Sequence, residues 1–130
     1  MPSEIQPAAL KRVLVADDDD AVCALLSRVL RPLALVTAVG DGEAAIAALN
    51  RIRFDAIVSD YALPGMDGLA LVRLVRALTP APPIPILMIS AHGAEVGDER
   101  ARAAGADAFL AKPFSLEQLR SALGKLLGTT

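Results

Sequence analysis

A chain of 130 residues with a net charge of −2 is long enough for one domain, and 54 % of its residues are hydrophobic. No cluster of Lys and Arg forms the basic patch that nucleic-acid binding needs, so this function class is excluded for the domain. The single cysteine, Cys23, excludes an internal disulfide, and no apolar segment reaches the roughly 20 residues of a membrane span. We therefore expect a cytoplasmic protein without membrane contact.

Apolar runs of strand length alternate with helical patterns along the chain. Residues 1–10 contain two prolines and mixed polarity, which predicts a flexible lead-in, and one domain is expected over residues 11–128. Short apolar runs predict strands, in chain order at residues 11–16, 33–39, 55–59, 83–90 and 107–112. Apolar residues at i, i+3 and i+4 predict helices at residues 21–30, 42–52, 69–78, 94–104 and 116–127.

Capping residues mark the beginning of three of these helices. Asp20, Asp41 and Ser115 are the expected N-caps, and Ser115 with Gln118 has the form of a capping box. The fourth helix contains Gly97, which costs about 1 kcal/mol relative to alanine, so we expect this helix to be short or mobile. Alternating strands and helices predict a parallel, doubly wound α/β sheet with helices on both faces.

Polar side chains follow four of the expected strands. The first strand ends in the acidic run 17–20, the third in Asp60, the fourth in Ser90 and the fifth in Lys112. An open α/β sheet binds ligands outside the carboxyl ends of its strands, so these groups should converge on one edge. Carboxylates crowded there repel one another unless a cation is present.

A hard divalent ion, Mg²⁺ or Mn²⁺, resolves this repulsion. Carboxylates and a carbonyl are ligands that Mg²⁺ prefers, and the chain offers Asp17, Asp18, Asp60 and the backbone carbonyl of Ala62. Lys112 adds a fixed positive charge and Ser90 a hydrogen-bond donor. An aspartate between a metal and a lysine is arranged to attack a phosphoryl group. We therefore interpret Asp60 as a site of aspartyl phosphate formation.

Four motifs occur in order: VLVADDDD, IVSDYALPGMDG, ILMISAHG and GADAFLAKPF. Through them the chain, from about Lys11 to Leu127, resembles the receiver domain of bacterial two-component response regulators. The resemblance implies a flavodoxin-like (βα)5 fold with a five-stranded parallel sheet in the order 2-1-3-4-5. It also implies that Asp60 accepts a phosphoryl group from a phosphohistidine of a sensor histidine kinase or of a phosphotransfer protein.

The same resemblance assigns further roles. Phe109 corresponds to the aromatic switch residue, and the Lys112–Pro113 peptide bond is expected to be cis. Ala62 and His92 occupy the two positions that tune dephosphorylation. Because Ala62 cannot orient a water molecule, we expect an aspartyl phosphate that is not unusually short-lived. Switching is expected to change partner binding through the face formed by the fourth helix, fifth strand and fifth helix, and the downstream protein partner is left open.

Two alternative functions are compatible with the sequence. A degenerate receiver would act only as a protein-interaction module. A Mg²⁺-dependent phosphatase with an aspartate nucleophile would use the Asp-x-Asp spacing that residues 17–20 also provide. For the favoured reading we expect only self-catalysed phosphorylation and dephosphorylation of Asp60, without turnover of a separate substrate. Whether the chain acts alone or belongs to a longer protein stays open.

Overall fold

The structure, a computed structural model, describes residues 11–79, 82–91 and 97–128. These residues form one parallel sheet of five strands in the order β2-β1-β3-β4-β5. The strands are β1 (Lys11–Ala16), β2 (Ala34–Val39), β3 (Ala56–Asp60), β4 (Ile86–Ser90) and β5 (Ala108–Ala111). The helices are α1 (Asp20–Leu30), α2 (Gly42–Leu49), α3 (Gly68–Leu78), α4 (Gly97–Ala104) and α5 (Leu116–Leu127). The predicted flavodoxin-like fold and its strand order are confirmed.

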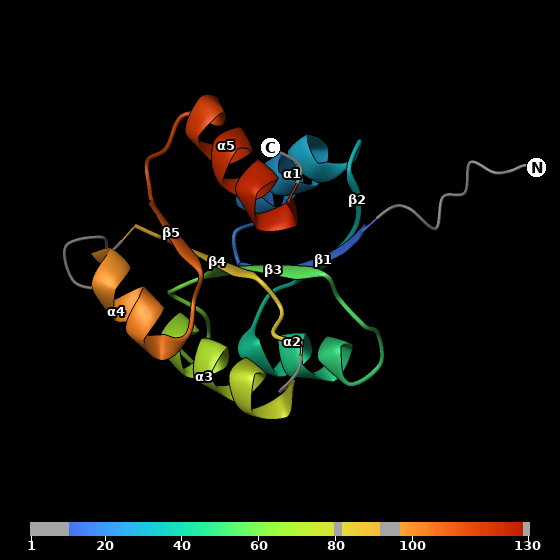
Figure 1. The fold of residues 1–130 in the computed structure, drawn as a ribbon, viewed down its shortest axis with the longest axis vertical. Coiled ribbons are helices and arrows are strands. Elements are labelled where there is room, and N and C mark those ends of the chain that lie inside the picture. Colours follow the sequence, from blue (N-terminus) through green and yellow to red (C-terminus); the bar gives the residue numbers. More distant parts are fainter. Residues whose placement is uncertain (1–10, 80–81, 92–96, 129–130) are drawn as a thin grey trace, which may run out of the picture.

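Helices cover both faces of the sheet: α1 and α5 lie on one face, and α2, α3 and α4 lie on the other (Figure 1). Alternate residues of each central strand point into two separate apolar cores. Val13, Val15 and Val58 pack toward α1 and α5, whereas Leu14 and Ile57 pack toward α2 and α3. Burial on both faces explains why the strands are almost continuously apolar in sequence. None of the described helices is long and apolar enough to cross a membrane.

Two predicted helix caps are confirmed and one is wrong. Asp41 caps α2, and Ser115 with Gln118 forms the capping box of α5. The N-cap of α1 is Asp19, not Asp20, because the Asp19 carboxylate accepts the amides of Ala21 and Val22. Each of the four consecutive aspartates has a carboxylate that could cap a helix, and the position at which β1 ends determines that Asp19 is the N-cap.

Some element bounds differ from the predicted ones for local reasons. Strand β4 begins at Ile86, three residues later than expected, since the prolines before it have no amide to donate. Helix α2 ends at Leu49 rather than at residue 52. Helix α4 has 8 residues against 11 in α3, and Gly97 begins it, with φ +68, instead of lying inside it. Residues 1–10 and 94–96 lie outside the described residues.

Candidate functional site

The first part of the site is the turn between β1 and α1. The Asp17 amide donates to the Val39 carbonyl at 3.0 Å, and the Asp17 carboxylate accepts the Asp19 amide at 2.9 Å. Asp17 is only 2 % exposed, yet its Oδ2 has no hydrogen-bond partner among the described residues. Asp18 is exposed beside it. This turn therefore holds one buried carboxylate with an unsatisfied oxygen and one that solvent reaches.

The second part is Asp60, the last residue of β3, which is 6 % exposed. The loop after it is folded back, because the Tyr61 amide donates to the Ile89 carbonyl at 2.9 Å and the Gly68 amide to the Tyr61 carbonyl at 2.6 Å. A Cβ at Gly68 would lie 2.6 Å from the Asp60 carbonyl oxygen. The start of α3 thus needs a glycine in order to pack directly behind Asp60.

Carboxylate oxygens of Asp17, Asp18 and Asp60 all lie within 4.8 Å of one another. The Lys112 ammonium lies 3.5 Å from Asp17 Oδ2 and 3.5 Å from Asp60 Oδ1. Burial raises the pKa of the Asp60 carboxyl and the Asp17 charge raises it further, whereas Lys112 lowers it. One ammonium thus does not balance three carboxylates, and the group of hard oxygen donors fits a divalent cation.

The other predicted site residues are placed as follows. Ser90 is fully buried at the end of β4, and its carbonyl accepts the Lys112 amide at 2.7 Å. The Lys112–Pro113 peptide bond is cis. Phe109 lies on β5 beside Met88, partly buried, and lines a groove along α5. Ala62 is exposed in the loop after Asp60, and His92 lies outside the described residues.

Sequence reasoning missed two residues that position the acidic group. Gly68 is one, and its signal was the glycine that ends the turn-rich loop. The other is Cys23, whose thiol donates to the Asp17 carbonyl at 3.2 Å. Burial and then the neighbouring Asp17 raise the pKa of the Cys23 thiol, so it stays protonated and able to donate. No sequence pattern distinguishes this contact from ordinary helix packing.

Residues 13–124 match the family model described as the response regulator receiver domain. The chain belongs to this family. It is 37 % identical over 119 residues to the probable transcriptional regulatory protein TcrX of Mycobacterium tuberculosis, which covers 91 % of this chain and 50 % of the relative. The chain thus spans about half the length of the curated relatives that it matches.

Solved receiver domains resemble the structure closely. The chemotaxis response regulator CheY4 of Vibrio cholerae is 32 % identical with a TM-score of 0.82, over 91 % of this chain and 99 % of that chain. The receiver domain of the sensor histidine kinase PA1611 of Pseudomonas aeruginosa is 32 % identical with a TM-score of 0.80, over 92 % and 99 %. That structure has a magnesium ion coordinated in its active-site cleft. Receiver domains bind Mg²⁺ in an acidic site, and Asp17, Asp18 and Asp60 form such a group here.

Proposed function

We propose that this chain is the phospho-accepting receiver of a two-component phosphorelay. A phosphohistidine of a sensor kinase or phosphotransfer protein supplies the phosphoryl group, and Asp60 accepts it. Asp17, Asp18 and Asp60, with the backbone carbonyl of Ala62, hold Mg²⁺ or Mn²⁺. The observation that carries the proposal is the close group of three carboxylates with Lys112 at 3.5 Å from two of them.

The proposed transfer forms one bond and breaks one. An Asp60 carboxylate oxygen attacks phosphorus, the phosphorus–nitrogen bond breaks, and its electron pair stays on the imidazole nitrogen, which then takes up a proton. The cation, when bound, supplies positive charge against the carboxylates and the phosphoryl oxygens. The Lys112 ammonium pairs with the phosphoryl oxygens, since it already lies 3.5 Å from Asp60. Partial burial keeps competing water from Asp60.

The proposed switch joins Asp60 to the face formed by α4, β5 and α5. The new phosphoryl group accepts a hydrogen bond from the Ser90 hydroxyl, and Phe109 turns inward. Phe109 is suited to this because it is only partly buried and lines a groove of about 740 Å³ between β5 and α5. A change of its rotamer alters the floor of that groove and hence the binding of a partner protein.

Several narrower expectations belong to the same proposal. Ala62 and His92 set the rate of dephosphorylation, and the aspartyl phosphate is not unusually short-lived. The domain occupies residues 11–128, acts in the cytoplasm, binds neither nucleic acid nor membrane and turns over no separate substrate. Measuring the decay of the aspartyl phosphate in the wild type and in Ala62→Asn tests the first expectation. We expect Ala62→Asn to lose its phosphoryl group faster, because the new amide can orient an attacking water molecule.

The decisive experiment is intact mass measurement with acetyl phosphate and Mg²⁺. We expect a gain of one phosphoryl group that disappears with EDTA and in Asp60→Asn. The matched control is Asp20→Asn, which removes an exposed carboxylate of the same acidic run and should keep the gain. No gain and no beryllofluoride binding in a folded sample would instead identify a degenerate receiver that only binds proteins.

A further inference from the structure

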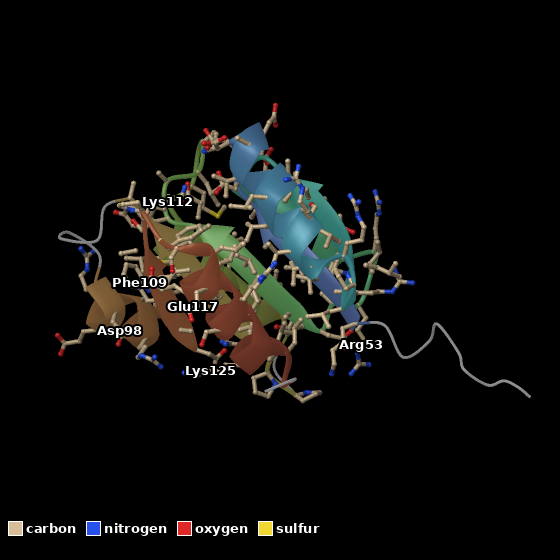
Figure 2. The ribbon with its side chains drawn as sticks, turned by 90° about the horizontal axis from the view of Figure 1, so that it is seen from above. Arg53, Asp98, Phe109, Lys112, Glu117 and Lys125 are labelled. Atoms are coloured by element: carbon tan, nitrogen blue, oxygen red, sulfur yellow. The ribbon has the colours of Figure 1, made fainter. Side chains whose placement is uncertain are left out.

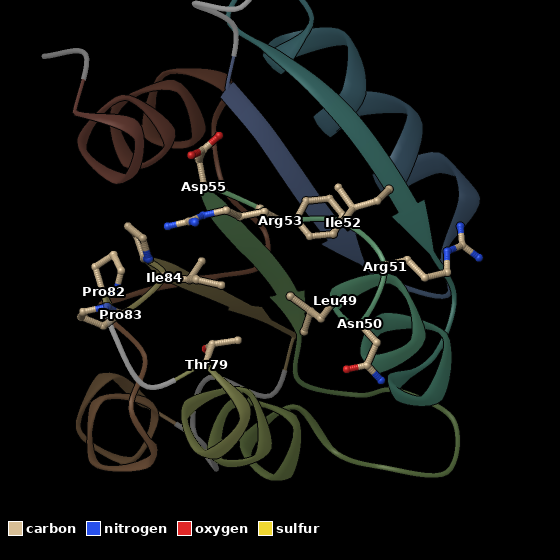
Figure 3. Close-up of a pocket in the computed structure, with 12 residues that line it drawn as sticks. Leu49, Asn50, Arg51, Ile52, Arg53, Asp55, Thr79, Pro82, Pro83 and Ile84 are labelled. Atoms are coloured by element: carbon tan, nitrogen blue, oxygen red, sulfur yellow. The ribbon is translucent and has the colours of Figure 1, made fainter.

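A second concave site lies at the opposite edge of the sheet, where the strands begin. It has a volume of about 480 Å³ and lies between residues 49–55, which join α2 to β3, and Thr79 with residues 82–85, which lie before β4 (Figure 3). Leu49, Ile52, Phe54 and Ile84 supply apolar lining. Its size falls in the range of about 300–1,000 Å³ that is usual for sites of small ligands.

Arg53 gives this pocket a charged rim. Its side chain extends over the pocket toward Ile84, whereas the side chain of Arg51 points away (Figure 3). Among the described residues, neither guanidinium pairs with a carboxylate. Asp55 also lines the pocket and keeps its negative charge, although its carboxylate accepts the Arg12 amide at 2.8 Å. Arg53 is therefore a cation without a carboxylate partner among the described residues, beside a surface of mixed apolar and polar residues.

Charged side chains at the two ends of the helices differ in sign. Acidic residues occupy the first turns of α1, α2, α4 and α5, near the carboxyl edge of the sheet. Basic residues occupy last turns, at the edge where the pocket lies: Arg28, Arg76, Arg102 and Lys125. Figure 2 shows Arg53 and Lys112 at opposite ends of the molecule. This separation offsets the helix dipoles, and Arg76 and Arg102 are also paired with Asp107 and Asp98. The positive charge at the pocket itself comes from Arg51 and Arg53, which together exceed the one carboxylate of its lining, Asp55.

We propose that the pocket binds a small anion with an apolar body, such as an aromatic carboxylate, phosphate or sulfonate. The Arg53 guanidinium donates two parallel hydrogen bonds to the acidic group, a geometry that guanidinium matches well. Leu49, Ile52 and Ile84 cover the apolar body. The pocket lies at the far end of β3 from Asp60, so occupation of the pocket does not require phosphorylation.

The test uses the full 130-residue chain and anilinonaphthalene sulfonate, an aromatic anion that fluoresces when bound. We expect saturable binding of one molecule per chain, about tenfold weaker in Arg53→Gln because a charge-assisted hydrogen bond is lost. Arg73→Gln is the matched control, with the same charge change at an exposed position outside the pocket lining, and should stay within about twofold. The uncharged N-phenylnaphthylamine should bind both variants alike.

Magnetic resonance locates the bound probe. Amide shifts confined to residues 49–55 and Ile84 support the pocket, and thermal melting verifies that both variants are folded. Equal losses in Arg73→Gln and Arg53→Gln would show a general charge effect and overturn the proposal. Shifts confined to the groove along α5, or an absence of saturable binding to the folded wild-type chain, would overturn it as well.

Discussion

At the carboxyl edge of the sheet three carboxylates share one ammonium, whereas at the amino edge Arg53 lies over a pocket of mixed apolar and polar lining, with no carboxylate partner among the described residues. The strands β3 and β4 join the two edges, and between their ends they are buried and apolar except for Ser59. Each edge therefore has an excess of charge of one sign: three carboxylates against Lys112 at one edge, and Arg51 and Arg53 against Asp55 around the pocket at the other. The comparison teaches that the interior of this fold supplies stability, while an excess of charge at its edges indicates where ligands bind.

The largest expected effect concerns the one cation of the acidic edge. Lys112→Met leaves Asp17 and Asp60 without their shared ammonium and leaves the phosphoryl oxygens without a partner. Electrostatic contacts of this kind contribute about 100-fold or more to a reaction rate. We expect phosphorylation by acetyl phosphate to slow by about that factor. Intact mass measured over time gives the rate. Lys125→Met, which removes an ammonium on α5, should change the rate little; equal losses would contradict the role of Lys112.

The amino edge depends on a different cation for its shape. Arg76 donates to the Gly105 carbonyl at 2.9 and 2.8 Å, to the Ile84 carbonyl at 2.6 Å and to Asp107 at 2.9 Å. Arg76→Ala removes this partner from the Gly105 and Ile84 carbonyls, whereas Asp107 still accepts the Ile86 amide at 2.8 Å. We expect the free energy of unfolding to fall by about 2–3 kcal/mol. Urea unfolding measures it. Exposed Arg73, on the same helix, is the control, and Arg73→Ala should stay within about 0.5 kcal/mol.

Backbone packing behind Asp60 gives the next effect. Gly68→Ala places a Cβ 2.6 Å from the Asp60 carbonyl oxygen and 2.8 Å from the Tyr61 Cα, neither of which can rotate away. Such overpacking costs about 1–3 kcal/mol, and the displaced Asp60 should also react more slowly. Gly40→Ala, with nothing within 4 Å of the added Cβ, should leave both unfolding and phosphorylation near wild type. If Gly68→Ala had the same free energy of unfolding as the wild type, the proposed clash behind Asp60 would be contradicted.

The two edges also differ in how far the sequence predicts them. The carboxyl edge was predictable, because parallel strands bring their ends together and Asp17, Asp60 and Lys112 each follow an apolar run. Local chemistry likewise predicted the Asp41 and Ser115 caps. The amino edge was not predictable, since Arg76 reaches partners 29 and 31 residues away through loops that have no periodic pattern. The pocket depends on residues 49–55 and 82–85, which likewise have no periodic pattern, so only the folded chain reveals it.

The smallest expected effect is the pH dependence of the acidic edge without metal. An ordinary aspartate titrates near pKa 3.8, and burial and Asp17 raise the pKa of Asp60 above that value. The folded chain then holds a proton that the unfolded chain has released, so the free energy of unfolding falls as the pH rises from about 3.8 through the raised pKa. Urea unfolding in EDTA should show this fall in the wild type.

Asp60→Asn should make that fall shallower, because the neutral amide has no charge to repel Asp17. Asp20→Asn, which removes an exposed carboxylate outside the acidic group, should keep the wild-type slope. Mg²⁺ should flatten the slope of the wild type and raise its stability, since a ligand that binds only the folded state stabilises it by about 1.4 kcal/mol at ten times its Kd. An identical slope in Asp60→Asn and wild type would show that the repulsion is already balanced by Lys112, and the acidic edge would then need no second cation.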